Sequence, residues 1–226
     1  MAISILYTTE KPDMARNLAA GIELWTRGAS KPTNLKEMHK DGCIKMSGGE
    51  HITFLFGHML EMAPPDEYLD ESQRKGNPLD YLPFQLNEKV VKKWPKPDRD
   101  KSGKPKLGKD GKPVESQQLR NLVRFIKQAK KIVNAGDTDR EGQLIMDELF
   151  MYAGVDPRAP HVFRLSLESP KKEDIAKLLE KGPDRNSDEK WVRRYTAALT
   201  REICDWNLGM TGSRAYRHVT GFSRMS

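Results

Sequence analysis

The chain has 226 residues, of which 37% are hydrophobic and 31% are charged, and its formal net charge is +7. This length suits one large domain, or one domain with part of another. Neither a membrane-spanning apolar run nor the basic start of a signal peptide occurs. We therefore expect a cytoplasmic protein that has no membrane partner.

The charge is unevenly distributed. Residues 92–112 carry nine Lys or Arg against three Asp, and residues 191–226 carry six arginines against two acids. Residues 137–148 instead contain five acids against Arg140. An acidic centre beside an arginine-rich arm can hold a phosphate backbone together with a metal ion.

The first half of the chain alternates between strand and helix patterns. Residues 3–8 predict a strand, and Pro12 begins a helix to about residue 25. A hairpin is predicted for 43–46 and 52–56, and another strand for 84–91.

The predicted elements continue past a basic loop. Residues 95–113 are almost free of apolar side chains, so we expect an exposed, flexible loop. A helix over about 115–130 and a strand over 131–135 follow. Such alternation predicts an α/β domain with a largely parallel sheet for residues 1–155.

The chain changes character after residue 156. We predict a strand over 162–167, then a helix that is capped by Ser169 and ends before Gly182. A long helix is predicted from about residue 188 to 208.

Three carboxylates lie on the turn that follows the strand over 131–135. Asp137, Asp139 and Glu141 come at the carboxyl end of this strand, where open α/β sheets place their ligands. Closely spaced carboxylates repel one another unless a cation joins them, and Mg²⁺ accepts a few carboxylates and keeps several waters. The alternative is a solvated turn in which Asp139 or Glu141 caps the next helix.

Glu10 and Lys11 follow the first predicted strand and can reach the same sheet edge. Glu10 can serve there as a metal ligand or a general acid, and Lys11 can bind a phosphate or depress the pKa of the acid. The alternative for both is a solvated loop beside a helix N-terminus.

Four candidate DNA-binding residues lie on the long predicted helix and after the Gly-rich turn that follows it. Arg201 and Asp205 have i, i+4 spacing, which fits either a guanidinium held for nucleotide contact or an ordinary surface ion pair. Trp206 can stack on a base or belong to the core. Arg214 can hold a phosphate bidentately or be solvated.

Five motifs occur in a recognisable order. They are Glu10-Lys11-Pro12, Phe56-Gly57-His58-Met59-Leu60-Glu61, Ala135-Gly136-Asp137-Thr138-Asp139-Arg140-Glu141-Gly142-Gln143, Arg164-Leu165-Ser166-Leu167, and the set from Arg201 through Asp205-Trp206 to Arg214-Ala215-Tyr216. Together they resemble the type IA DNA topoisomerases, above all the topoisomerase III branch. The acidic turn alone fits any Toprim domain, including those of primases and some nucleases.

The resemblance implies a Toprim (Rossmann-like) domain over 1–155 and the start of a mainly helical DNA-groove domain over 156–226. It implies roles for nine residues. Glu10, Asp137 and Asp139 resemble the Mg²⁺ ligands, with Glu141 supporting; Glu10 and Lys11 resemble the catalytic pair; Arg201, Asp205, Trp206 and Arg214 resemble residues that bind single-stranded DNA.

The resemblance also implies an ATP-independent, single-strand transesterification by a tyrosine. None of the six tyrosines has the expected Tyr-Pro-Arg-Thr type of context, and residues 222–226 resemble the beginning of a further family motif. We therefore expect the N-terminal portion of a longer, nucleoid-associated enzyme whose tyrosine-bearing domains lie downstream. The alternatives are a non-catalytic single-strand DNA-binding accessory protein and a Toprim nuclease.

Overall fold

The computed structural model describes residues 3–28, 42–109 and 114–221. The last part of the predicted basic loop and the motif at 222–226 lie outside these residues. Among the described residues, no helix has the combined length and apolar character that a membrane span requires.

The chain forms two compact units, one from residues 1–60 and 95–195 and the other from 61–94 and 196–226. The domain division predicted at residues 155 and 156 differs from this grouping of contacts and stays a prediction.

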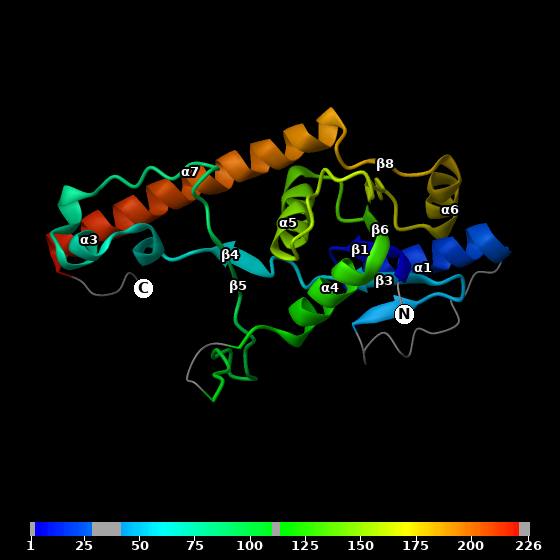
Figure 1. Ribbon diagram of the computed structural model, residues 1–226, viewed down its shortest axis with the longest axis horizontal. Helices are drawn as coiled ribbons and strands as arrows, with labels where there is room; N and C mark the ends of the chain where they lie inside the picture. The colour runs from blue at the N-terminus through cyan, green and yellow to red at the C-terminus, as the bar shows by residue number, and fades with distance from the viewer. Residues whose placement is uncertain (1–2, 29–41, 110–113, 222–226) are drawn as a thin grey trace. The chain divides into compact units, whose positions relative to one another are not determined.

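A six-stranded, mostly parallel sheet forms the first unit and confirms the predicted α/β fold (Figure 1). Its strands, in chain order, are β1 (Ile3–Thr9), β2 (Cys43–Lys45), β3 (Glu50–Phe54), β6 (Ala129–Asn134), β7 (Val162–Arg164) and β8 (Asp184–Arg185). In space the order is β2-β3-β1-β6-β7-β8. The four central strands are parallel, while β2 and β8 run antiparallel to their neighbours.

Helices pack against both faces of this sheet. They are α1 (Pro12–Arg27), α4 (Gln117–Gln128), α5 (Arg140–Tyr152) and α6 (Lys172–Lys181). Successive strand residues point to opposite faces, so Leu6 and Ile132 join the core of α4 and α5. Tyr7 and Val133 join the core of α1 and α6. The period-2 pattern therefore builds a three-layered α/β/α core.

The second unit contains short elements and the larger part of the long helix. These are η2 (Pro65–Tyr68), α3 (Glu71–Lys75), η3 (Pro78–Asp80) and α7 (Glu189–Thr220), of which Glu189–Tyr195 belongs to the first unit. The two-stranded pair β4 (Leu60–Met62) and β5 (Lys93–Pro95) lies at the unit boundary. The core of the second unit is built on Leu69, Phe84 and Trp206.

Three local predictions were wrong. Residues 84–91 form no strand, because the backbone N–H groups of Phe84 and Leu86 donate to Thr211 Oγ1 and Asn207 Oδ1, each at 3.0 Å. Helix α7 continues to Thr220, since its glycines cost helical stability without ending the helix.

The third wrong prediction concerns the cap of α6. Lys171 is the N-cap residue, and the Ser169 hydroxyl instead donates to Asp174 Oδ2 at 2.7 Å.

The described part of the basic loop is exposed, as predicted. It also has more internal order than predicted, because Arg99 and Pro105 form a β-bridge and Lys106 Nζ lies 2.8 Å from Asp98 Oδ2.

Candidate functional site

The acidic turn connects β6 to α5 at the carboxyl edge of the sheet. Asp139 is the N-cap of α5, and its Oδ1 accepts a hydrogen bond from the Gly142 N–H at 2.7 Å. This cap satisfies one of the free donors at the helix start. The capping alternative is therefore realised for Asp139, which remains exposed to solvent.

Glu10 and Lys11 reach the acidic turn because β1 and β6 are parallel neighbours. Thr8 pairs with Asn134, so both strands end at the same place. Lys11 Nζ lies 2.6 Å from Asp137 Oδ2 and 3.6 Å from Glu10 Oε1. The Lys11 ammonium thus joins the carboxylates of Glu10 and Asp137, which lie 127 positions apart in the sequence.

The surroundings of Glu10 favour its protonated form. Burial is the largest cause that raises the pKa of this carboxyl, and the negative charges of Asp137 and Asp139 raise the pKa further. The Lys11 ammonium acts in the opposite direction and lowers the pKa. The net increase gives Glu10 a carboxyl proton at higher pH than an isolated glutamate keeps, which suits a general acid.

A fully buried arginine holds the backbone of the acidic turn. Arg164 NH1 donates to the carbonyls of Asn134, Gly136 and Leu165, at 3.1, 3.0 and 2.7 Å. Its NH2 donates to the Asp137 carbonyl at 2.7 Å. Burial lowers the pKa of this guanidinium to about 10, so it remains a cation at neutral pH.

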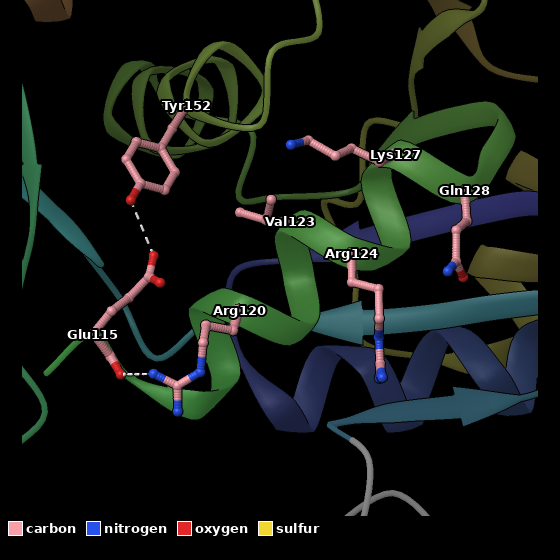
Figure 2. A pocket seen from close by; sticks show the side chains of 7 residues that line it. All are labelled: Glu115, Arg120, Val123, Arg124, Lys127, Gln128 and Tyr152. Atoms are coloured by element: carbon pink, nitrogen blue, oxygen red, sulfur yellow. Dashed lines mark hydrogen bonds between the residues drawn. The ribbon is translucent and has the colours of Figure 1, made fainter.

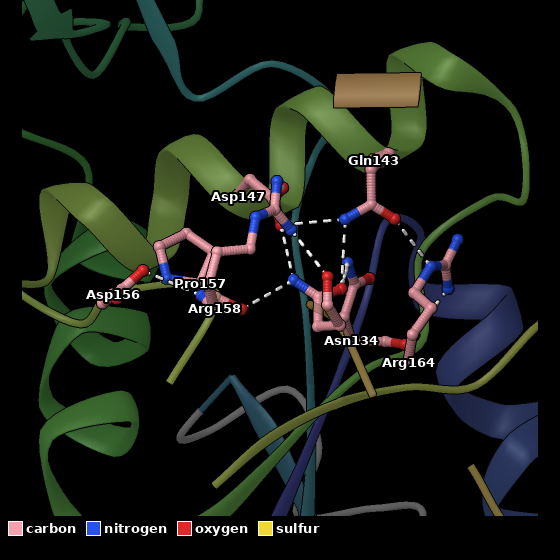
Figure 3. Close-up of polar contacts among 8 residues, drawn as sticks. Asn134, Gln143, Asp147, Asp156, Pro157, Arg158 and Arg164 are labelled. Atoms are coloured by element: carbon pink, nitrogen blue, oxygen red, sulfur yellow. Dashed lines mark hydrogen bonds and ion pairs between the residues drawn. The ribbon is translucent and has the colours of Figure 1, made fainter. Parts of the chain in front are cut away.

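A buried polar network connects Arg164 to the body of α5 (Figure 3). Arg164 Nε donates to Gln143 Oε1 at 3.0 Å, and Gln143 Nε2 donates to Asp147 Oδ1 at 2.9 Å. Asp147 Oδ2 accepts from Arg158 NH2 at 2.6 Å, and Asn186 Nδ2 donates to Asp147 Oδ1 at 2.9 Å. Because these buried groups satisfy one another, the start of α5 is fixed relative to the sheet.

Helix α7 also contacts the turn within the first unit. Arg194 NH1 donates to the Thr138 carbonyl. Trp191 is buried and contacts the guanidiniums of Arg164 and Arg194, each of which has its Cζ 4.8 Å from the ring centroid. Sequence patterns do not identify these residues as supports of the site, because only the tertiary structure brings α7 to the turn.

The carboxylate oxygens at this edge are the kind of ligand that a hard cation such as Mg²⁺ prefers. Glu10, Asp137 and Asp139 meet at one edge, and the Lys11 ammonium lies where two of the carboxylates share a positive charge. Glu141 is half-buried in the first turn of α5, and no described contact joins it to the other acids. In the described residues, no three acidic, histidine or cysteine side chains already have metal-binding geometry, so the metal site stays a prediction.

The predicted DNA-binding residues all lie in the second unit. Arg201 Nε is 3.5 Å from Asp205 Oδ2, and both side chains are exposed. Arg214 NH2 lies 2.5 Å from Asp66 Oδ1, and the side chain of Arg214 is 25% exposed. A surface ion pair of either kind is compatible with phosphate binding, since its partner is readily exchanged.

Trp206 is only 8% exposed, whereas stacking on a base requires a ring that is open to solvent. Its centroid lies 5.2 Å from those of Tyr68 and of Phe84, both in edge-on contacts. Trp206 therefore belongs to the core of the second unit, which is the alternative given above, and its role in DNA binding stays a prediction.

The parallel sheet, with Glu10 and the acidic turn at its carboxyl edge, defines an α/β domain of the Rossmann-like class. The Toprim domain family matches residues 6–170, and the chain belongs to this family.

Curated relatives extend the similarity beyond the Toprim region. The chain is 32% identical to "DNA topoisomerase 3" of Vibrio cholerae serotype O1, over 93% of this chain and 28% of the relative. It is 32% identical to "DNA topoisomerase 3" of Haemophilus influenzae, over 93% of this chain and 27% of the relative. It is 31% identical to "DNA topoisomerase 3" of Salmonella typhimurium, again over 93% and 27%. The chain therefore spans little more than a quarter of the length of these relatives.

Proposed function

We propose that the chain supplies the Toprim part of a type IA DNA topoisomerase that cleaves and rejoins single-stranded DNA with Mg²⁺. The observation that carries this proposal is the bridge of Lys11 to Glu10 and Asp137 at the edge where β1 and β6 end. The similarity to proteins named DNA topoisomerase 3 supports it. A nucleoid-associated location follows from the same proposal.

Glu10, Asp137 and Asp139 would hold the metal, with Glu141 as a supporting acid. When bound, Mg²⁺ would supply positive charge that positions the scissile phosphate backbone. The Lys11 side chain is 58% exposed, so its ammonium can exchange Asp137 for a DNA phosphate. Glu10, with its raised pKa, would carry the proton for the leaving sugar oxygen.

The second unit would bind the DNA strand. Arg201 and Arg214 present guanidiniums that can exchange a carboxylate for a phosphate, while Asp205 orients Arg201. Trp206 would support this surface through the core that it forms with Tyr68 and Phe84. We expect single-strand binding that is salt-sensitive and largely independent of sequence.

Mg²⁺ binding tests the metal assignment. The parent chain should show an increase in melting temperature with millimolar Mg²⁺, because ligand that binds the native state stabilises it. Asp137→Asn with Asp139→Asn should abolish this increase, since both changes remove charge from the donor set. Differential scanning fluorimetry with Mg²⁺ titration measures the effect.

A matched control removes two carboxylate charges elsewhere in the first unit. Glu173→Gln with Glu180→Gln changes two exposed acids on α6. This variant should respond to Mg²⁺ as the parent does. An equal response of the Asp137/Asp139 variant would exclude the proposed metal site.

The two alternative functions give different products. A Toprim nuclease would release free DNA ends with Mg²⁺ and no protein–DNA adduct. An accessory protein would bind single strands and leave them intact even when the tyrosine-bearing part of the enzyme is supplied.

A further inference from the structure

The first unit has a basic groove beside α4, lined by side chains of this helix, Glu115 and the end of α5 (Figure 2). The groove has a volume of about 580 Å³, and Arg120, Arg124 and Lys127 line it together with Tyr152 and Glu115. Tyr152 is the last residue of α5, whereas the acidic turn lies at the first. The helix has 13 residues from 140 to 152, and its rise separates the two places by about 18 Å.

The three cations form a row. Arg120, Arg124 and Lys127 have i, i+4, i+7 spacing, which places them on one face of α4 over about 10 Å. All three are exposed. Arg120 donates to the Glu115 carbonyl and to Gln117 Oε1. Arg124 donates to Asn121 Oδ1 at 3.4 Å, and its Cζ lies 4.9 Å from the centroid of the Phe125 ring. These acceptors are neutral, and the Asp98 carboxylate, which interacts with the charge of Arg120 and is also paired with Lys106, compensates the row only in part.

The acid in the groove is held by a neutral partner. Glu115 Oε1 accepts a hydrogen bond from the Tyr152 hydroxyl at 3.0 Å, which closes one end of the groove. Glu115 makes no ion pair with the row in the described contacts. The charge of the groove therefore remains positive.

The neighbouring loop increases this positive charge. Pro97 forms a β-bridge with Glu115, so the basic loop begins beside the groove. Among the described residues of 95–128, nine Lys or Arg stand against three acids, which gives +6. Two of these acids, Asp98 and Asp100, belong to the loop itself and bind within it.

We propose that this groove is a second nucleic-acid site, which binds the phosphate backbone through Arg120, Arg124 and Lys127. A row of about 10 Å matches the length over which one strand of duplex DNA presents about three phosphates. Cations without base-reading partners contact the backbone and do not specify sequence. The groove also offers a single, half-exposed aromatic ring, so stacking adds little. Single strands and duplexes therefore bind through the same charges.

Salt-dependent binding in EDTA tests this site without any contribution from Mg²⁺. The full chain and its Arg120→Gln/Arg124→Gln/Lys127→Gln variant are titrated with labelled 20-nucleotide single strands and 20-base-pair duplexes, by fluorescence anisotropy. The variant should bind both probes on the order of 10-fold more weakly at low salt, and the salt slope should fall by about 2 to 3.

Two further variants distinguish the effect of the charges at this groove from the effect of the net charge of the chain. Lys171→Gln/Lys177→Gln/Lys181→Gln removes three charges around α6 and should bind as the parent does. Arg120→Lys/Arg124→Lys/Lys127→Arg keeps the charges and should retain the salt slope. Circular dichroism confirms that each variant is folded.

Either of two results would overturn the proposal: equal salt slopes for the glutamine variant at α4 and the one at α6, or tighter binding of a 20-residue polyglutamate than of either DNA probe. The second result would mark the groove as a site for an acidic protein segment. Both results are independent of the Asp137 and Asp139 variants, so the metal site is tested separately.

Discussion

One buried guanidinium determines where the acidic turn presents its carboxylates. Arg164 binds the carbonyls of Asn134, Gly136 and Asp137 with a planar set of donors. A lysine has one ammonium and cannot reproduce this fork. The residue thus acts through the backbone of the turn, and its own charge never needs to reach the substrate.

Arg164→Lys should lower the free energy of unfolding by about 3 kcal/mol or more, because several buried carbonyls lose their donors. The variant should also show a smaller Mg²⁺-induced increase in melting temperature. Urea unfolding, followed by circular dichroism, measures the first effect. Arg193→Lys, in an exposed pair with Glu189, is the control and should change stability by less than about 0.5 kcal/mol.

At the scale of elements, the junction of β6 with α5 requires close approach of two backbone segments. A Cβ at Gly142 would lie 2.5 Å from the Asp137 carbonyl oxygen and 3.0 Å from the Asp137 N. Neither atom belongs to a flexible side chain, so the turn itself would have to move. The glycine thereby couples the start of the helix to the position of the Asp137 carboxylate.

Gly142→Ala should therefore destabilise the chain by about 1–3 kcal/mol, as an overpacked site does. It should also weaken the response to Mg²⁺, since Asp137 is displaced. Gly209→Ala on α7 is the matched control: a Cβ there meets nothing within 4 Å. Helix propensity predicts a stabilisation of up to about 1 kcal/mol for this control. Equal effects of the two variants in thermal unfolding would contradict the coupling.

The elements that could be predicted from sequence are those whose pattern is local. Alternation of apolar residues gave β1, and the proline at the start of α1 gave its first turn. Residues 84–91 have a strand-like composition, yet their backbone donors bind side chains of α7 more than 120 positions away. Local composition cannot reveal that competition.

At the scale of the whole molecule, parallel pairing of β1 with β6 explains why the approach of Glu10 to the acidic turn was predictable. Glu10 and the acidic turn each follow a strand, and neighbouring parallel strands end at one edge. The supports of the turn were not predictable in the same way, because Arg164, Trp191 and Arg194 meet only through packing. The burial of Trp206 likewise depends on Tyr68 and Phe84, which the sequence separates from it widely.

The 226-residue chain should form no covalent adduct with single-stranded DNA and should not relax supercoiled DNA, even with Mg²⁺. A nucleophilic tyrosine must lie in line with a phosphate at the acidic site. Tyr7 is buried in β1, Tyr68 packs on Trp206, and the Tyr152 hydroxyl is bound to Glu115. A denaturing gel with end-labelled DNA should therefore show no shifted band. Addition of a tyrosine-bearing portion of a DNA topoisomerase 3 relative should produce one. An adduct of the chain alone, lost in Tyr216→Phe, would instead identify this exposed tyrosine as the nucleophile.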